Sequence, residues 1–216
     1  MMRKNFLVIG LGRFGTSLAC SLADAGHEVL GVDIDSDIVQ ELSSRLAHLV
    51  TLDAANEDAL ASLGVNNFDA AIVASGKNFE SSVLITLLLK RLGARYVVAK
   101  AITEQQAEVL KRIGADQVVQ PEREAGARLA RLLISPNVLE YLELEQGISV
   151  AEIHAPASMN GKTVAELDLR RRYKITVLLI KNGDRYLISP DLDDRIQMGD
   201  TLVVVGRDED ISRLRE

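Results

Sequence analysis

FLVIGLGRFG, residues 6–15, is the stretch of sequence that decides the fold. Its first four residues form an apolar strand pattern, and its last six match the pattern G-x-G-x-x-G. A helical pattern follows from Leu11 to Ala25, and Gly26 ends it as a C-cap. A strand, a glycine-rich turn and a helix in this order are typical of the phosphate-binding turn of dinucleotide-binding domains.

The glycines of this turn have separate physical roles. Gly10 permits the tight turn, Gly12 lets the backbone approach a pyrophosphate, and Gly15 lets helix and strand pack closely. The diphosphate would then lie on helix N–H donors at the positive end of the dipole. Asp33 ends the second strand, about where a ribose-binding acid belongs, and it would repel a 2′-phosphate. A purely structural turn is disfavoured because all of these features agree.

Apolar strands and helical segments alternate outward from this turn. Strands this apolar are buried on both faces, and helical connections between them make the sheet parallel. The sequence therefore predicts an α/β fold with a doubly wound, parallel Rossmann-like sheet. The expected strands are 6–9, 28–33, 48–52, 70–74, 96–99 and 117–119.

The pattern changes after residue 120. Residues 121–134 predict a helix, residues 138–144 predict a second short helix, and the rest is richer in strands. We therefore predict a nucleotide-binding domain over 1–134, a helical linker over 135–146 and a smaller C-terminal α+β domain over 147–216.

Composition narrows the class of protein. The chain has 216 residues, 47% of them apolar, and a net charge of −6, which offers no basic field for nucleic acid. Its one cysteine, Cys20, allows no intramolecular disulfide. No apolar stretch is long enough for a membrane span. We expect a cytoplasmic protein that reaches a membrane only through a partner.

Further candidate ligand contacts follow the other strands. Asp53 and Ala54 follow the third strand, where an adenine should lie, and Ser75, Gly76 and Lys77 follow the fourth.

Two residues inside the glycine turn and one beside Asp33 complete this predicted site. Arg13 and Phe14 lie in the turn, and Ile34 directly follows Asp33. A dehydrogenase does not require a charge at Arg13, whereas a protein that binds ATP or ADP could use it on the terminal phosphate. A solvated side chain is an equally weighted alternative for Arg13.

Catalytic groupings are missing from the sequence pattern. His27 and His48 fit structural positions, and His154 is remote in the second domain. No Ser/His/Asp grouping, paired carboxylates or Cys/His metal spacing appears. We predict that the protein is not an enzyme. An NAD(H)-binding oxidoreductase or a redox sensor stays the alternative, although a transcriptional sensor would need a helix-turn-helix that is not seen.

Several stretches together resemble a known family. Those of the first domain resemble RCK (KTN) domains: 6–15, 27–33, 100–101, 114–116 and 121–122. Those of the tail resemble the associated C-terminal RCK (TrkA-C) domain: 161–163, 167–170, 173–175 and 199–206. The resemblance covers essentially the whole chain and is closest to the single-copy cytosolic subunits of Ktr-type potassium uptake systems.

This resemblance implies an assembly and a ligand. Such subunits form homodimers and then a homo-octameric ring beneath a membrane potassium-translocating subunit, on the inner face of the membrane. ATP favours the active ring and ADP the inactive one, and NAD(H) can occupy the same cleft. The resemblance thus implies a regulatory subunit that gates potassium uptake.

The resemblance also implies roles for individual residues. Arg13 matches an arginine near the terminal phosphates, Asp33 the ribose-binding acid, and Lys100 a lysine near the nucleotide. Glu122 matches an acid near the dimer interface that, in some members, helps hold a divalent or monovalent activating cation beside the ATP phosphates. The apolar face of the helix over 121–134 matches the crossover helix that links two protomers.

A second ligand is implied for the C-terminal domain. Some family members bind cyclic di-AMP there, in a dimer groove. Thr176 and Ala165 depart from the residues of some binding members. The matching positions here are Asp168, Arg170, Ile175 and Pro190.

Overall fold

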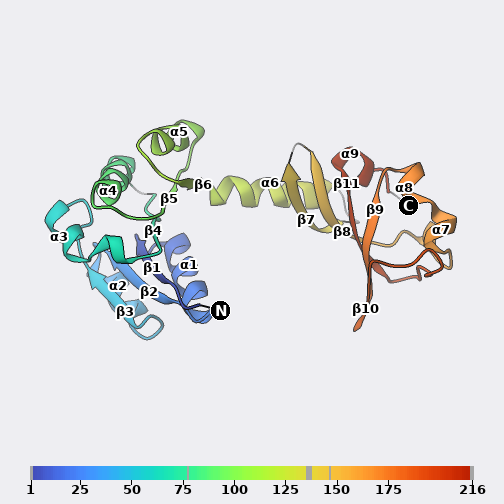
Figure 1. The fold of residues 1–216 in the computed structure, drawn as a ribbon, viewed down its shortest axis with the longest axis horizontal. Helices are drawn as coiled ribbons and strands as arrows, with labels where there is room; N and C mark the ends of the chain where they lie inside the picture. Colours follow the sequence, from blue (N-terminus) through green and yellow to red (C-terminus); the bar gives the residue numbers. More distant parts are fainter. Residues whose placement is uncertain (1, 77, 135–137, 146, 215–216) are drawn as a thin grey trace. The chain divides into compact units, whose positions relative to one another are not determined.

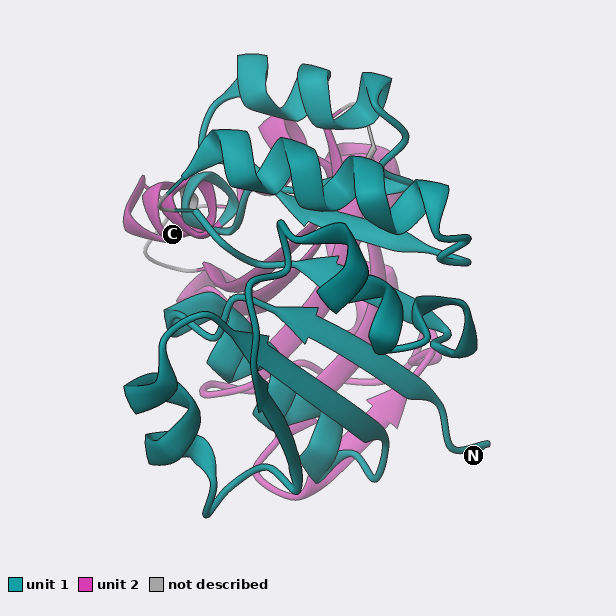
Figure 2. Cartoon of the chain, turned by 90° about the vertical axis from the view of Figure 1, so that its left-hand side faces the viewer, with its two compact units in different colours: residues 1–124 teal, residues 125–216 magenta. Residues whose placement is uncertain are grey.

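The computed structural model describes residues 2–76, 78–134, 138–145 and 147–214 (Figure 1). The chain forms two compact units, Met1–Glu124 and Ala125–Glu216, coloured separately in Figure 2. Each unit has its own sheet. Within the described ranges, no helix combines the length and the apolar character needed to cross a bilayer.

A parallel sheet of six strands forms the centre of the first unit, in the order β3-β2-β1-β4-β5-β6. This confirms the predicted doubly wound α/β architecture. Its strands are β1 Asn5–Ile9, β2 Glu28–Asp33, β3 His48–Thr51, β4 Ala70–Val73, β5 Val97–Lys100 and β6 Gln117–Val119.

Helices cover the sheet on both faces (Figure 2). Polar side chains begin several of them: Asp35, Asn56, Asn78 and Thr103 each accept a hydrogen bond from a backbone N–H in the first turn. The helices are α1 Arg13–Asp24, α2 Ser36–Leu42, α3 Glu57–Ser62, α4 Phe79–Arg91 and α5 Glu104–Arg112, with a 3₁₀ turn η1 at Val65–Asn67.

The central strand β1 shows why the interior of this sheet is apolar on both faces. Leu7 and Ile9 pack in the layer that includes residues of α3, α4 and α5, and Val8 packs in the layer that includes residues of α1 and α2. Leu7 and Val8 are both 0% exposed. Burying each such side chain contributes roughly 1.5–3 kcal/mol, so both faces of the sheet stabilise the unit.

The second unit contains an antiparallel five-stranded sheet in the order β10-β9-β11-β8-β7. Helix α6, Pro121–Ile134, begins in the first unit and continues into the second. The strands are β7 Val138–Glu145, β8 Ile148–His154, β9 Thr176–Asn182, β10 Arg185–Ile188 and β11 Thr201–Arg207. The short helices are η2 Ala157–Met159, α7 Val164–Leu167, α8 Leu169–Arg172 and α9 Asp208–Ile211.

The helix predicted over 138–144 is wrong, and so is the helical character of the predicted linker (135–146) over its described residues, 138–145. Residues Val138–Glu145 form strand β7, which pairs antiparallel with β8 and places Tyr141 opposite Ala151. The neighbouring strand satisfies the backbone groups of this segment better than an isolated short helix would. The turn predicted at 135–137 lies outside the described residues. The chain divides into compact units after Glu124, inside α6. The predicted domain bounds at residues 134 and 147 stay predictions.

Candidate functional site

Close backbone contacts explain two of the loop glycines. Gly10 has a φ of +91°, and a Cβ on it would lie 2.7 Å from the Ser75 amide nitrogen. A Cβ on Gly15 would lie 1.9 Å from the Gly10 carbonyl oxygen. The Thr16 hydroxyl donates to the Leu11 carbonyl over 2.7 Å and holds the turn. The loop therefore has its shape before any ligand arrives.

Helix α1 begins differently from the capped helices α2 to α5. Its N-cap is Gly12, no side chain caps it, and no acidic residue lies in its first turn. A Cβ on Gly12 would meet no atom within 4 Å, so the space above this residue is open. The first N–H groups of α1 are therefore free to bind an anion at the positive end of the helix.

Asp33 ends β2 with both carboxylate oxygens held by backbone donors. Leu11 N–H donates to Oδ2 over 2.6 Å, and Asp35 N–H donates to Oδ1 over 3.0 Å. Each oxygen keeps a lone pair that can accept from a ribose hydroxyl. Ile34 is 68% exposed and offers an apolar surface next to this carboxylate. The contribution of the Leu11 N–H was not predicted, although Leu11 lies within the glycine pattern.

Asp53 and Ala54 have different environments although they are neighbours. Asp53 is exposed just beyond β3, and its Oδ1 accepts a hydrogen bond from Ala55 N–H over 3.0 Å. Ala54 is 4% exposed and packs in the core. Asp53 can therefore present its other carboxylate oxygen to a ligand, whereas Ala54 anchors the loop by packing in the core.

The loop after β4 connects the phosphate loop to β5. Ser75 lies against Gly10, and a Cβ on Gly76 would lie 3.6 Å from the Lys100 Nζ. The structure thus brings Gly10, Ser75, Gly76 and Lys100 together at the carboxyl edge of the sheet, as predicted for this fold. Lys77 lies outside the described residues.

Lys100 and Glu122 form an ion pair of 2.6 Å at the same edge. The side chain of Lys100 is 11% exposed and that of Glu122 is 67% exposed. The Lys100 Nζ also lies 5.7 Å from the centroid of the Phe14 ring, within range of a cation–π contact. The hydrogen bond from Lys100 lowers the pKa of Glu122 below its ordinary value.

Gln120 belongs to this edge too, although it was not among the predicted site residues. Its Oε1 accepts a hydrogen bond from Arg123 over 3.3 Å, but its Nε2 is buried without a partner in the described part of the chain. A polar residue directly after the sixth strand, at the edge where ligands bind, would have been the clue.

Arg13 and Glu122 supply charge of opposite sign near the loop. Arg13 is the first residue of α1 and is exposed. Over the described residues, no three His, Cys, Asp or Glu side chains group so as to hold a metal ion. A cation at Glu122 would therefore need further oxygen ligands, such as phosphate oxygens.

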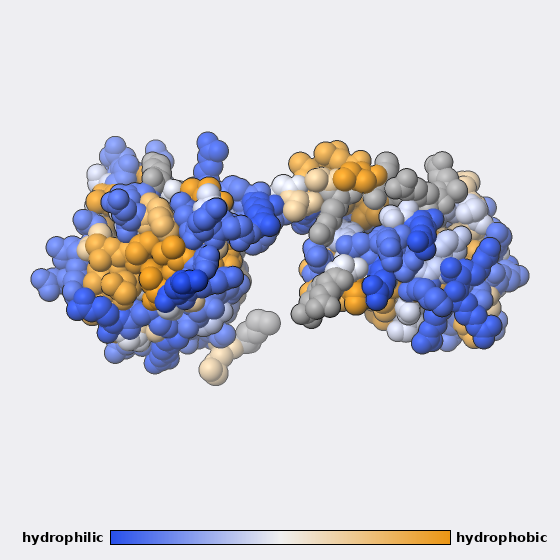
Figure 3. All heavy atoms as spheres, turned by 90° about the horizontal axis from the view of Figure 1, so that it is seen from above, coloured by the Kyte–Doolittle hydropathy of each residue, from blue (hydrophilic) through white to orange (hydrophobic). Residues whose placement is uncertain are grey.

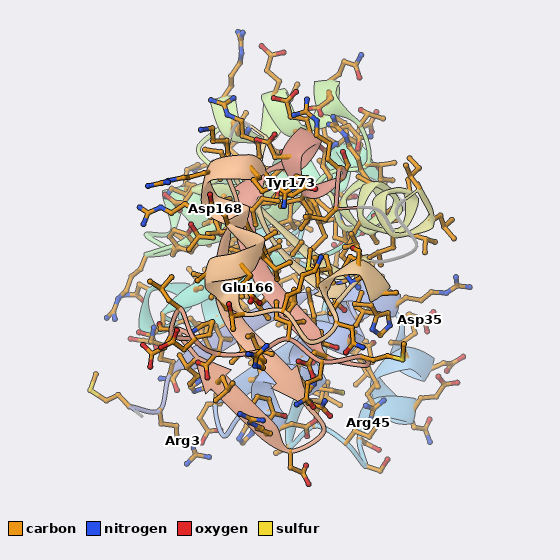
Figure 4. The ribbon with its side chains drawn as sticks, turned by 90° about the vertical axis from the view of Figure 1, so that its right-hand side faces the viewer. Arg3, Asp35, Arg45, Glu166, Asp168 and Tyr173 are labelled. Carbon is orange, nitrogen blue, oxygen red and sulfur yellow. The ribbon has the colours of Figure 1, made fainter. Side chains whose placement is uncertain are left out.

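The residues predicted for a second ligand lie in the second unit. Asp168, labelled in Figure 4, has a φ of +44° between the short helices α7 and α8, and Arg170 is exposed. Pro190 follows β10 and is half-buried. Ile175 is 1% exposed within the core, so the structure does not bring its side chain to the surface.

Comparison with known proteins decides the family. The TrkA-N domain matches residues 6–121, and the TrkA-C domain matches residues 148–216. The chain belongs to the TrkA family. These two matches span both units and agree with the resemblance deduced from the sequence.

Relatives in the TrkA family are similar along almost their whole length. The Ktr system potassium uptake protein C of Bacillus subtilis is 43% identical, over 100% of this chain and 97% of that protein. The Ktr system potassium uptake protein A of the same organism is 40% identical, over 97% and 95%. The Vibrio alginolyticus Ktr system potassium uptake protein A is 36% identical, over 94% and 92%.

Solved structures agree with the TrkA-family fold. The crystal structure of the GsuK RCK domain is 27% identical, with a TM-score of 0.53, and the match covers 96% of this chain and 45% of that one. The GsuK channel is 25% identical, with a TM-score of 0.52, over 99% of this chain and 38% of that one. These similarities confirm an RCK-type arrangement of elements.

Proposed function

We propose that this chain is a nucleotide-binding regulatory subunit of a potassium uptake system and has no catalytic activity of its own. The observation that carries the proposal is the 43% identity, over the full chain, to a Ktr potassium uptake protein. The uncapped start of α1 beside Asp33 supports nucleotide binding as the means of regulation.

The positive charges of Lys100 and Arg13 favour a nucleotide with several phosphates. Lys100 lies beside Phe14 and Gly76, and Arg13 begins α1. Both cations lie near the uncapped helix end where a diphosphate would bind. ATP and ADP are therefore the proposed ligands. NAD(H) fits the loop and Asp33 equally well but does not use both cations.

The proposed switch depends on the terminal phosphate. A γ-phosphate adds negative charge beside Arg13, and Glu122 lies at the first turn of the helix that leads into the second unit. Ligands that differ in this charge bind two conformations of the protein unequally and shift their populations. A cation held between Glu122 and the phosphates would add to this difference.

Exposed apolar surface supports the proposed homodimer and homo-octamer. Leu84 and Leu87 on α4 are each 41% exposed, and Val109 on α5 is 38% exposed. Figure 3 shows apolar residues gathered on the face of the first unit where α4 and α5 lie. Leu129 and Leu133 on α6 are 57% and 73% exposed. Apolar patches of this kind mark contacts between proteins.

The proposed partner is the membrane potassium-translocating subunit, and the proposed location is the cytoplasmic face of the membrane. The names of the three Ktr relatives support this partner. Cyclic di-AMP binding at Asp168, Arg170, Ile175 and Pro190 stays a prediction.

Native mass spectrometry and potassium flux together test the proposal. The purified protein is offered ATP, ADP, NAD and NADH in equal amounts, and its assembly and bound ligand are read together. An octamer that carries ATP or ADP is expected, and ATP should raise flux through the reconstituted transporter more than ADP. A dimer that carries only NAD or NADH would overturn the proposal.

Arg13 offers a sharper test of the switch. Arg13→Ala should abolish the difference between ATP and ADP in the flux assay, because the variant lacks the cation beside the terminal phosphate. Unchanged discrimination would exclude this role for Arg13.

A further inference from the structure

Lys100 is a cation with little access to water. Its side chain is 11% exposed, its ammonium lies 2.6 Å from Glu122 Oε1, and the Phe14 ring centroid is 5.7 Å away. Taking an ammonium out of water is costly unless an anion stays beside it. Because Glu122 is itself 67% exposed, the carboxylate can leave for water at much lower cost than Lys100 can.

A second anion can reach Lys100 from the phosphate loop. Gly10 approaches Ser75 closely because it has no side chain, and a Cβ on Gly76 would lie in ordinary contact with the Lys100 ammonium, at 3.6 Å. These contacts connect the uncapped end of α1 to Lys100 through the loop after β4. A phosphate chain that begins on α1 and runs along this loop comes toward the Lys100 ammonium.

We propose that Lys100 distinguishes longer from shorter phosphate chains by exchanging Glu122 for a terminal phosphate. In the empty site the carboxylate pairs with Lys100, and in the ATP complex the phosphate takes its place. The inference rests on the proposed function, since it requires a nucleotide on the phosphate loop. A phosphate carries more charge and more acceptor oxygens than a carboxylate, which favours the exchange.

The exchange acts on the first turn of α6. Among the described residues, two ion pairs hold this turn to other elements of the first unit: Lys100 with Glu122, and Arg123 with Glu104. Losing the first pair leaves the second in place. A nucleotide whose terminal phosphate reaches Lys100 therefore removes one ion pair from the first turn of α6, the helix that leads into the second unit.

Glu122 and the terminal phosphate compete for Lys100, and this competition determines whether each variant should bind nucleotide more tightly or more weakly. Nucleotide affinities of the full chain are measured by calorimetry with ATP, ADP and AMP in EDTA, so that no metal bridges Glu122 to the phosphates. Glu122→Gln removes the competing charge, so ATP should bind about 3- to 10-fold more tightly and AMP equally well. Lys100→Met should weaken ATP by about 10- to 100-fold and leave AMP within about twofold of the wild type.

The double variant and two controls separate exchange from general damage. In the Lys100→Met background, Glu122→Gln should no longer increase the affinity for ATP, because the cation for which Glu122 and the phosphate compete is absent. Lys100→Arg, which keeps the charge, should restore most of the preference for ATP. Glu108→Gln breaks an exposed pair with Arg112 and should change none of the affinities.

The outcomes also distinguish this inference from the proposed function. Weaker ATP binding by Glu122→Gln in EDTA overturns the exchange, as does an equal loss of ATP and AMP in Lys100→Met. If the wild type binds none of the three nucleotides, the proposed function fails and this inference fails with it. If all three bind and the variants behave like the wild type, only the exchange is wrong.

Discussion

Gly12 and Gly15 lie in the same loop but are glycines for different reasons. A Cβ on Gly15 would lie 1.9 Å from the Gly10 carbonyl oxygen, a backbone atom that cannot rotate away. A Cβ on Gly12 would meet no protein atom within 4 Å, and its φ of −67° suits any residue. The fold therefore requires Gly15, whereas only a ligand that approaches the loop requires Gly12.

Alanine at each position should separate stability from binding. Gly15→Ala should lower the free energy of unfolding by about 3 kcal/mol, because backbone must shift to accept the methyl group. Gly12→Ala should unfold like the wild type but bind ATP at least about tenfold more weakly, since the methyl group occupies the approach of the phosphates. Urea unfolding and ATP titration measure the two effects. Wild-type affinity in Gly12→Ala would contradict the placement of phosphates on this loop.

The sequence could predict residues whose role depends on local spacing. Gly10, Gly15 and Asp33 belong to a pattern whose spacing follows from strand, turn and helix geometry. It could not predict the contact between Lys100 and Glu122, which lie 22 residues apart and meet because β5 and β6 are neighbours. The burial of Ile175 likewise depends on which strands cover it.

Strand β7 shows the limit of prediction at the scale of elements. Residues 138–145 read VLEYLELE, in which apolar residues recur at spacings that suit both a short helix and an edge strand. The partner strand β8 decides the outcome, and no local signal reveals that partner. The central strands β1 and β4 of the first unit were predictable because burial on both faces leaves residues 6–9 and 70–73 entirely apolar.

Asp116 joins three elements of the first unit. Its Oδ2 accepts a hydrogen bond from Val97 N–H over 2.7 Å, at the start of β5, and Lys90 at the end of α4 donates to both oxygens over 3.1 and 3.0 Å. Burial raises the pKa of Asp116, but the hydrogen bonds from Val97 and Lys90 outweigh it, and the pKa falls below its ordinary 3.8. The ionised carboxylate therefore stabilises the fold.

Asp116→Asn should lower the free energy of unfolding by about 1–2 kcal/mol at neutral pH, because the charge-assisted bonds are lost. A carboxyl group whose pKa is lower in the folded state than in the unfolded state stabilises the fold at pH values above its unfolded pKa. This stabilisation is lost as the pH falls through its folded pKa. The difference from the wild type should thus stay constant down to about pH 5 and shrink below about pH 3.8.

Urea unfolding at several pH values measures this difference. Glu108→Gln serves as the control, because its pair with Arg112 is exposed and contributes at most about 0.5 kcal/mol. A difference that grows as the pH falls would contradict the role given to Asp116.

The whole molecule has separate cores in its two units. The hydrophobic clusters of the first unit end at Val118, and that of the second begins at Leu132. No residue belongs to clusters of both units among those described. Helix α6 carries the chain from one core to the other, so a signal that passes along the chain from nucleotide to second unit passes through it.

Matched core substitutions should test this independence. Leu202 in β11 and Leu7 in β1 are both 0% exposed, one in each unit. Leu202→Ala should destabilise its unit by about 3 kcal/mol, because it leaves a cavity in the core. It should raise hydrogen exchange within 148–214 and leave ATP affinity within about twofold of the wild type. Leu7→Ala should raise exchange within 5–119 and weaken ATP binding. If either variant raised exchange equally in both ranges, the two units would be one cooperative structure, and the ion pairs at the start of α6 could not act as a separate switch.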